Sequence, residues 1–351
     1  MKTSKTQNGV ALITALIITT IAVSLAATVI YRQQIQIRLS SNIAHLEQAY
    51  LYANGIEDWA GTILKKSFDD HKDYDSLEDD WATGGKLISL PIDGGVMNGQ
   101  LFDLQGRINL NSLARPVPPP VKLTNPDGTI INPPPIQKPD IAKITRYRLL
   151  NIIQEIDPDS EMGPPQNFAQ VVKDWIDKDQ INGNKKPEGE SSGSGAESPY
   201  YQSLEPAYFS ANTLMVSPTE IRLLKDMKKE VYTKLLPLVS TLPIQDKTPI
   251  NINTAGEEVL RSLGFDPGAA QDIIQERKIN PFKKIDSSFL TNIMNQQGQN
   301  IEKKDLDVKS SYFLLKGSVS INNARVFIYS VLKRDKKNGK VSVIMRDFSN
   351  P

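Results

Sequence analysis

The chain has 351 residues, no cysteine, two histidines, and 41 basic against 40 acidic residues. This length is enough for two or three packed units with a substantial core. The absence of cysteine excludes thiol catalysis, disulfide bonds and Cys-ligated zinc or iron–sulfur sites, and two histidines nearly exclude a multi-histidine metal centre. A formal net charge of +1 argues against a chain that binds nucleic acid through a large basic surface.

The amino terminus is the most informative segment. Residues 1–9 are polar and contain two lysines, and the 21 residues of Val10–Ile30 contain no charge. As a helix this apolar stretch would span roughly 31 Å, which is about the thickness of a bilayer's hydrocarbon core. The lysines favour a cytoplasmic leader with the rest of the chain outside, although Arg32 and Arg38 weaken that charge argument.

The helical pattern continues past the apolar stretch. Apolar residues recur in steps of three and four, and the first proline is Pro91. We therefore expect one helix over residues 10–66, roughly 85 Å long, of which residues 10–30 cross the membrane. A cleaved secretory signal and a plain signal anchor are the alternatives. The apolar face is expected to comprise Leu39, Ile43, Leu46, Tyr50, Ala53, Ile56, Ala60 and Ile63.

This start of the chain resembles the type IV pilin and pseudopilin superfamily. Its members carry a short basic leader that ends in glycine and is removed by a prepilin peptidase, and the matching bond here is Gly9–Val10. The resemblance implies that Val10 becomes the new, N-methylated first residue. Most members have Glu as the fifth mature residue, and this Glu seeks the amino terminus of the subunit above. Thr14 stands in its place here, which fits a subunit at the tip with nothing above it.

Segments in which apolar and polar residues alternate occur before and after the middle of the chain, and they predict one antiparallel sheet. Strands and turns are expected from residue 86 to residue 111. Three more β-rich segments lie at the carboxyl end, where Asn-containing pairs mark tight turns. We expect them to complete the first sheet and to pack on the long helix. These segments are 311–321, 324–334 and 340–348, with turns at Asn322–Asn323 and Asn338–Gly339.

The segment between the strands is predicted to be largely helical. Residues 116–139 hold nine prolines and are expected to form a semi-rigid loop. Amphipathic helices are expected at 140–157, 166–177 and 218–236, and residues 249–282 resemble a helix-hairpin-helix unit. The expected buried face of the second helix consists of Phe168, Val171, Val172, Trp175 and Ile176.

Three stretches narrow the resemblance to the K-type minor pseudopilins of type II secretion. They are Phe102–Leu113 (FDLQGRINLNSL), Val172–Asp179 and Gly195–Tyr201. The resemblance implies an α+β fold in which the long helix packs on a pilin-like antiparallel sheet and a large α-helical domain, SAM-like or helix-hairpin-helix, is inserted in that sheet. The expected units are a leader (1–9), the helix (10–66), the first part of the pilin-like domain (67–111), the inserted domain (112–308) and the C-terminal strands (309–351). The inserted domain is expected to contain a Pro-rich loop (112–140), a first helical half (140–242) and a helix-hairpin-helix half (243–308).

An acidic cluster, Asp174, Asp177 and Asp179, lies at the end of the helix expected over residues 166–177. Calcium takes about six to eight oxygen ligands of the kind gathered there. An EF-hand is excluded because Ile181 occupies a ligand position and Gly183 comes one residue late. The alternative is a solvated acidic loop. The K-type resemblance implies a calcium site in this region, and the expected ligands are Asp177, Asp179, Glu197 and Asn212.

Two other functions match single motifs. Gly189-Glu-Ser191-Ser-Gly193 has the hydrolase pattern G-x-S-x-G, but no histidine follows residue 71, so we do not expect an enzyme. The helix-hairpin-helix stretch favours a membrane-tethered protein for DNA binding or uptake. Residues 250–290 carry six acids and five bases, which gives no electrostatic footprint for nucleic acid.

The resemblance implies a structural function. The chain is expected to lie at the tip of the type II secretion pseudopilus, where it initiates and caps the filament for export of folded proteins. The expected partners are the I- and J-type minor pseudopilins, the prepilin peptidase, the inner membrane and secreted cargo, but not nucleic acid. We expect a single-pass inner-membrane protein with its globular part in the periplasm.

Overall fold

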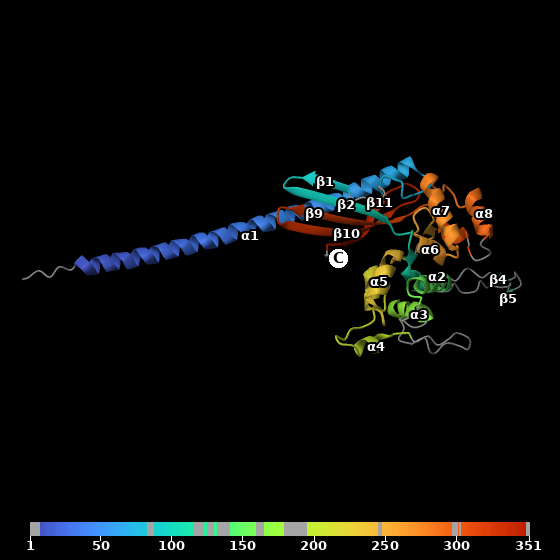
Figure 1. Cartoon of the computed structure of the whole chain (residues 1–351), viewed down its shortest axis with the longest axis horizontal. Helices are drawn as coiled ribbons and strands as arrows, with labels where there is room; N and C mark the ends of the chain where they lie inside the picture. The colour runs from blue at the N-terminus through green and yellow to red at the C-terminus, as the bar shows by residue number, and fades with distance from the viewer. Residues whose placement is uncertain are drawn as a thin grey trace, which may run out of the picture.

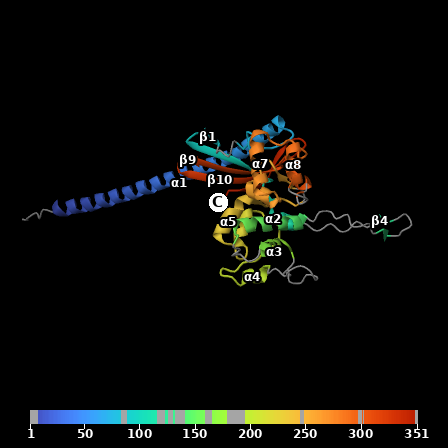
Figure 2. The same ribbon diagram turned by 45° about the vertical axis from the view of Figure 1, so that its right-hand side comes forward.

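A long helix, a sheet packed on its carboxyl half and a group of short helices beyond the sheet make up the molecule (Figure 1). The apolar start of the long helix projects away from everything else, and Figure 2 shows the same arrangement from a second direction. The computed structural model describes residues 8–82, 88–114, 123–124, 130–131, 141–158, 165–178, 195–244, 248–296, 301 and 303–348.

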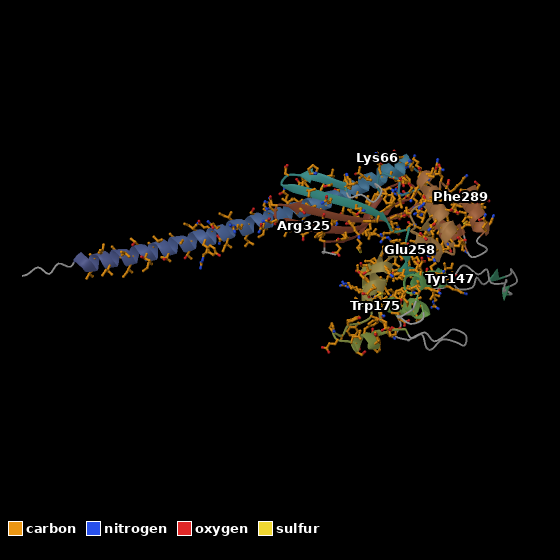
Figure 3. The ribbon with its side chains drawn as sticks, in the orientation of Figure 1. Lys66, Tyr147, Trp175, Glu258, Phe289 and Arg325 are labelled. Atoms are coloured by element: carbon orange, nitrogen blue, oxygen red, sulfur yellow. The ribbon has the colours of Figure 1, made fainter. Side chains whose placement is uncertain are left out.

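The long helix, α1 (Asn8–Asp70), confirms the expected continuous helix and extends slightly past both predicted ends. The predicted apolar face is correct only in its second half. Ala53, Ile56 and Ala60 are buried against the sheet. The earlier members are exposed, because the buried stripe that reaches the sheet begins at Ala49 and not at Leu46 or Tyr50. Figure 3 shows side chains projecting all along the amino-terminal part of α1, which lies beyond the sheet. These exposed members are Leu39, Ile43, Leu46 and Tyr50.

The sheet has five antiparallel strands in the order β1-β2-β9-β10-β11. The first two strands come from before the helical segment and the last three from after it, as predicted. Both predicted C-terminal turns are present, and Asn322 and Gly339 adopt the positive φ angles of 48° and 70° that such turns use. The strands are β1 (Ile88–Ile92), β2 (Gly95–Asp103), β9 (Tyr312–Ile321), β10 (Ala324–Arg334) and β11 (Val341–Asp347).

One face of the sheet packs on α1. Alternate residues of each strand point toward the helix, so that Leu101, Phe313 and Leu315 form one core with Ala53 and Ile56 of α1. Gly99 of β2 lies opposite Gly317 of β9 in the strand register. The absence of side chains at these two positions leaves room for Ile56, which would lie 3.3 Å from a Cβ atom at either glycine.

The helical part has its own, larger core. It is tied together by two short parallel strand pairs, β3 (Ile108–Asn109) with β6 (Val239–Ser240) and β7 (Ile250–Asn251) with β8 (Leu306–Asp307). Ile108 and Leu110 belong to this core, so the helical part starts before the expected boundary at residue 112. Its helices are η2 (Leu110–Ala114), α2 (Ile141–Ile156), α3 (Pro165–Ile176), α4 (Ser198–Gln202), η4 (Pro218–Leu223), α5 (Lys229–Leu235), η5 (Leu236–Leu238), α6 (Glu257–Ser262), α7 (Pro267–Ile279), α8 (Ser288–Gln296) and η6 (Lys303–Asp305).

The predicted helices of this part are present with one exception. The apolar face predicted for α3 is buried throughout, and the helix-hairpin-helix pattern appears as α6, a turn at Gly264 with a φ of 107°, and α7. The single helix predicted over 218–236 is wrong. It is divided into η4 and α5, because Asp226 adopts a left-handed φ of 57° that a helix cannot contain. Most of the Pro-rich loop lies outside the described residues, which include the short pair β4 (Leu123–Thr124) and β5 (Ile130–Ile131).

Candidate functional site

The projecting part of α1 has the properties of a membrane span. Within the described residues, α1 is the one helix that is long and apolar enough to cross a bilayer. Its hydroxyl side chains bond to the helix itself: Thr20, Ser24 and Thr28 each donate to the carbonyl four residues earlier, at 2.7 to 2.8 Å. Because no side-chain donor in this group needs water, the segment can enter lipid without unsatisfied hydroxyl groups.

The expected processing site lies at the start of this helix. The Gly9–Val10 bond falls in the first turn of α1, next to residues 1–7, which lie outside the described residues. Thr14, one turn further on, donates to the carbonyl oxygens of Val10 and Ala11 at 3.0 Å. Its hydroxyl group is therefore satisfied by its own chain and requires no partner from another subunit.

The acidic cluster lies at the carboxyl end of α3. Asp174 is 1% exposed and its Oδ1 accepts a hydrogen bond from Gln170 Nε2 at 2.5 Å. The backbone of Gly195 lies directly on the same carboxylate, since a Cβ atom at residue 195 would be 1.7 Å from Asp174 Oδ2. A side chain at this position would require the Asp174 carboxylate to move, whereas glycine lets the chain that carries Glu197 pass against the end of α3.

Two of the four expected ligands sit on this returning chain. Glu197 is 1% exposed and precedes α4, but its carboxylate does not cap that helix. Asn212 has a φ of 48°, and its N–H donates to the carbonyl oxygen of Trp175 at 2.9 Å. A hydroxyl chain joins the two: Ser210 donates to Asn212 Oδ1 at 2.8 Å and contacts Ser198, the neighbour of Glu197, at 2.6 Å.

Aromatic packing holds this arrangement in place. Trp175 meets Tyr201 edge-on with ring centres 5.1 Å apart, and its Nε1 donates to Glu220 Oε2 at 3.1 Å. Tyr201 is fully buried, and burial raises the pKa of its hydroxyl, which therefore remains neutral. These contacts fix α3, α4 and the capping box of Ser217 and Glu220 relative to one another.

The structure thus brings Asp177, Glu197 and Asn212 to one end of α3, with Asp174 as a buried neighbour. Asp177 follows the last turn of α3, where its N–H donates to the Lys173 carbonyl at 2.9 Å. Asp179 lies outside the described residues. In the part of the chain that the structure describes, no three Asp, Glu or His side chains converge closely enough to hold a metal ion by themselves.

The helix-hairpin-helix unit is built for packing rather than for phosphate. Asp266 caps α7, and its carboxylate accepts from Ala269 N at 2.8 Å, so an acid occupies the place where a phosphate would approach. Arg277 is buried and donates to the carbonyl oxygens of Ile252 and Ala255, at 2.7 and 2.6 Å. Its cation therefore holds the hairpin together and does not face a ligand.

Sequence reasoning missed a buried polar network at the junction between the sheet and the helical part. Asp103, at the end of β2, accepts from Thr254 Oγ1 at 2.5 Å and Ser310 Oγ at 2.6 Å, and Ser310 in turn accepts from Asn251 Nδ2 at 2.8 Å. These residues lie in three segments that are far apart in the chain. Burial raises the pKa of Asp103, although the two hydroxyl donors counteract this.

Comparison with known proteins identifies the family. Residues 106–244 and 250–309 match the family described as type II secretion system (T2SS), protein K. The type II secretion system protein K of Pseudomonas aeruginosa is 33% identical over 347 residues, which cover 97% of this chain and 92% of that protein. The protein K of Aeromonas hydrophila is 29% identical, with 96% of each chain covered.

A solved structure has the same fold. The present chain is similar to one chain of the crystal structure of the GspK-GspI-GspJ complex from the type 2 secretion system of enterotoxigenic Escherichia coli, with a TM-score of 0.64 and 22% sequence identity. The match covers 90% of this chain and 100% of that one. On the sequence matches, which extend over nearly the whole length, the chain belongs to the type II secretion system protein K family.

Proposed function

We propose that the chain is the structural subunit at the tip of a type II secretion pseudopilus, where it initiates and caps the filament that exports folded proteins. One observation carries this proposal: a single chain combines an apolar helix that protrudes at one end with a bulky helical part at the opposite end (Figure 1). A subunit stacked above would have to occupy the volume of that helical part. Membership of the protein K family supports the same role.

The proposed anchor is the first part of α1 in the inner membrane, with the globular part in the periplasm. Small residues of the span, such as Ala22, Ser24 and Ala26, would let helices of neighbouring subunits approach closely. Thr14 fits the top position because its hydroxyl group is already satisfied within α1. The proposed partners of the chain are the I- and J-type minor pseudopilins, since a similar solved chain is part of a GspK-GspI-GspJ complex. No catalytic step is proposed.

The first test concerns processing by the prepilin peptidase. We expect wild-type protein from membranes to begin at N-methylated Val10 and Gly9→Ala to keep the leader, because the peptidase must fit the backbone next to the cleaved bond. The measurement is the intact mass of the protein, together with secretion of a folded cargo. Gly55→Ala is the control, since Gly55 lies in the same helix and a Cβ atom there would meet nothing within 4 Å. Normal cleavage and secretion in Gly9→Ala would contradict the proposal.

We also propose that the acidic cluster at the end of α3 binds calcium. The donors are hard oxygens, which suit this ion, and a divalent cation would supply positive charge beside the buried carboxylates. Glu197, Asp177 and the side-chain oxygen of Asn212 would hold it, together with Asp179. When bound, calcium would supply a structural link between α3 and the chain from Gly195 to Asn212.

The test of calcium binding uses the full-length protein in detergent. Calcium should raise the temperature of unfolding and a chelator should lower it, by an amount that grows with calcium concentration. Glu197→Gln should lose most of this response, because it removes one buried charge while preserving size. Glu205→Gln is the matched control, since Glu205 is exposed on the same stretch of chain. Equal melting temperatures of the wild-type protein in calcium and in chelator would disprove the site.

A further inference from the structure

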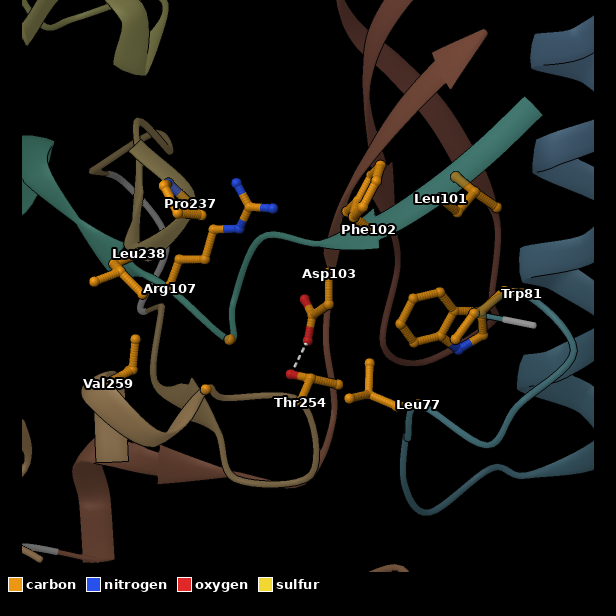
Figure 4. A pocket seen from close by; sticks show the side chains of 13 residues that line it. Leu77, Trp81, Leu101, Phe102, Asp103, Arg107, Pro237, Leu238, Thr254 and Val259 are labelled. Carbon is orange, nitrogen blue, oxygen red and sulfur yellow. Dashed lines mark hydrogen bonds between the residues drawn. The ribbon is translucent and has the colours of Figure 1, made fainter. Parts of the chain in front are cut away.

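A cavity of about 250 Å³ lies where the sheet meets the helical part. Figure 4 shows its wall, which combines the end of β2, the segment before residue 82 and the chain around α6. Most of the wall is apolar and therefore favours an apolar occupant. The apolar lining includes Leu77, Trp81, Leu101, Phe102, Leu238 and Val259.

Arg107 contributes a cation to this apolar wall. Its guanidinium extends between Pro237 and Phe102 (Figure 4). Among the described residues, none accepts a hydrogen bond from the Arg107 side chain. Burial lowers the pKa of Arg107, opposed by the nearby Asp103, yet an arginine stays charged in proteins. The structure therefore places a charged, multiply donating group in a partly desolvated cavity and gives it no acceptor within the described ranges of the chain.

Asp103 is too well satisfied to serve as that acceptor. Its Oδ2 accepts from Thr254 and Ser310, and its Oδ1 accepts from the backbone N–H of Gln105 at 2.8 Å. Its carboxylate acts on Arg107 only through the longer-range field. Arg107 itself lines the cavity, so its guanidinium can reach an acceptor that enters there.

A second cation lies beside the same cavity. Lys316 of β9 places its Nζ 5.2 Å from the ring centre of Phe102, which lines the cavity. The two cations flank one ring, since Lys316 lies over Phe102 and both Phe102 and Arg107 line the cavity. Burial lowers the pKa of Lys316, and the like charge of Arg107 lowers it further. Lys316 forms no ion pair with a carboxylate in the described part of the chain. An anion placed between the two cations would relieve their repulsion.

We propose that Arg107 and Lys316 form a binding site for a carboxylate attached to an apolar group. The carboxylate would accept two parallel hydrogen bonds from the guanidinium, and the apolar group would fill the cavity beside Phe102. The volume fits one aromatic or branched aliphatic group. The carboxylate can come from a free organic acid or from an acidic side chain next to an apolar residue on a polypeptide.

The test is calorimetric titration of the full-length protein in detergent with sodium benzoate. Benzamide is the uncharged isostere of the probe. We expect saturable binding of benzoate and none of benzamide. Arg107→Gln should weaken benzoate binding by roughly tenfold or more, and Lys316→Gln by less, because its ammonium group is more solvated. Arg325→Gln is the control, since Arg325 is an exposed cation of the neighbouring strand β10.

Melting temperatures separate binding from a structural role. Arg107→Gln removes a buried charge without removing a hydrogen bond within the described residues, so its melting temperature should equal or exceed that of the wild type.

A competition experiment with the peptide Gly-Glu-Phe-Gly distinguishes the two sources of the carboxylate. Displacement of benzoate by this peptide, but not by Gly-Gln-Phe-Gly, assigns the site to a polypeptide, and no displacement assigns it to a free acid. Absence of saturable benzoate binding, equal binding of benzamide, or unchanged affinity in both Arg107→Gln and Lys316→Gln would overturn the proposal.

Discussion

At the scale of the residue, Asp75 and Arg334 form an ion pair that is almost completely removed from solvent. Both side chains are 3% exposed or less, and Arg334 Nη2 lies 2.5 Å from each carboxylate oxygen of Asp75. The Arg334 guanidinium also donates to the carbonyl oxygens of Ser310 and Leu64 and lies over the ring of Phe313. Such a pair is stable only when both charges are present, because either one alone is a buried, uncompensated ion.

We therefore expect Asp75→Ala to lower the free energy of unfolding by about 3 to 5 kcal/mol. The measurement is denaturant unfolding followed by near-ultraviolet circular dichroism, which reports on the packed aromatic side chains. Asp80→Ala is the control: Asp80 pairs with Lys66, but their side chains are 69% and 65% exposed, so solvent already screens that pair and stability should hardly change. Equal losses in the two variants would show that burial does not set the strength of the Asp75 pair.

The sequence does not predict this ion pair. Asp75 occurs in an acidic stretch, DDHKDYDSLEDD, that resembles a solvated loop, and its partner follows 259 positions later. Local patterns carry no information on which acid is buried when the partner is so distant. By contrast, the buried face of α3 could be predicted residue by residue, because it depends only on helical periodicity within twelve residues. The expected calcium ligands are an intermediate case. They follow from the family resemblance and not from periodicity, and the structure brings three of them to one end of α3.

At the scale of elements, the contact between α1 and the sheet depends on glycine. A Cβ atom at Gly317 would lie 2.6 Å from Ile328 Cγ2 and 3.3 Å from Ile56 Cδ1, so the β-strand or the helix would have to move. We expect Gly317→Ala to destabilise the sheet by roughly 1 to 3 kcal/mol, the usual range for an overpacked core. Thermal unfolding of the full-length protein measures it.

Gly55→Ala is the matched comparison, because Gly55 lies in α1, the helix that packs on the sheet, but outside the close contact. Gly55 is exposed in α1, and a Cβ atom there would meet nothing within 4 Å. Alanine is the better helix former, so we expect this variant to be more stable by roughly 0.5 to 1 kcal/mol. If both glycine variants shifted stability in the same direction, the close packing at Gly317 would not explain the effect.

Element boundaries could be predicted where a residue type determines them. The turns at Asn322 and Gly339 follow from residues that tolerate positive φ, and the long helix follows from its unbroken apolar period. The error over residues 218–236 has the same physical origin: apolar periodicity continues across Asp226, and Asp adopts the left-handed conformation less predictably than Gly or Asn. The division into η4 and α5 therefore depends on tertiary packing, not on a local signal.

At the scale of the whole molecule, the sheet and the helical part have separate hydrophobic cores, and a small apolar cluster (Leu104, Leu242 and Tyr312) and a set of polar groups connect them. Asp103 is central to this connection, because its carboxylate accepts from Thr254 and Ser310 and lies 3.3 Å from Asn251 Nδ2. All of these neighbours donate. Asp103 thus adds to the apolar contacts at the junction an acceptor that has no equivalent among apolar or amide side chains.

We expect Asp103→Asn to loosen the junction while both cores stay folded. An amide has one acceptor oxygen where the carboxylate has two, and its NH₂ group cannot accept from the neighbouring donors. Some of these buried donors therefore lose their acceptor, at a cost of about 1 to 3 kcal/mol each. Hydrogen exchange should therefore accelerate at the junction amides of Asn251 and Ser310 and remain slow in the β9–β10 pair. Asp93→Asn, in the exposed turn between β1 and β2, is the control. Uniform acceleration through both cores would instead show that the two parts unfold as one cooperative unit, and unchanged exchange would show that apolar contacts alone fix their orientation.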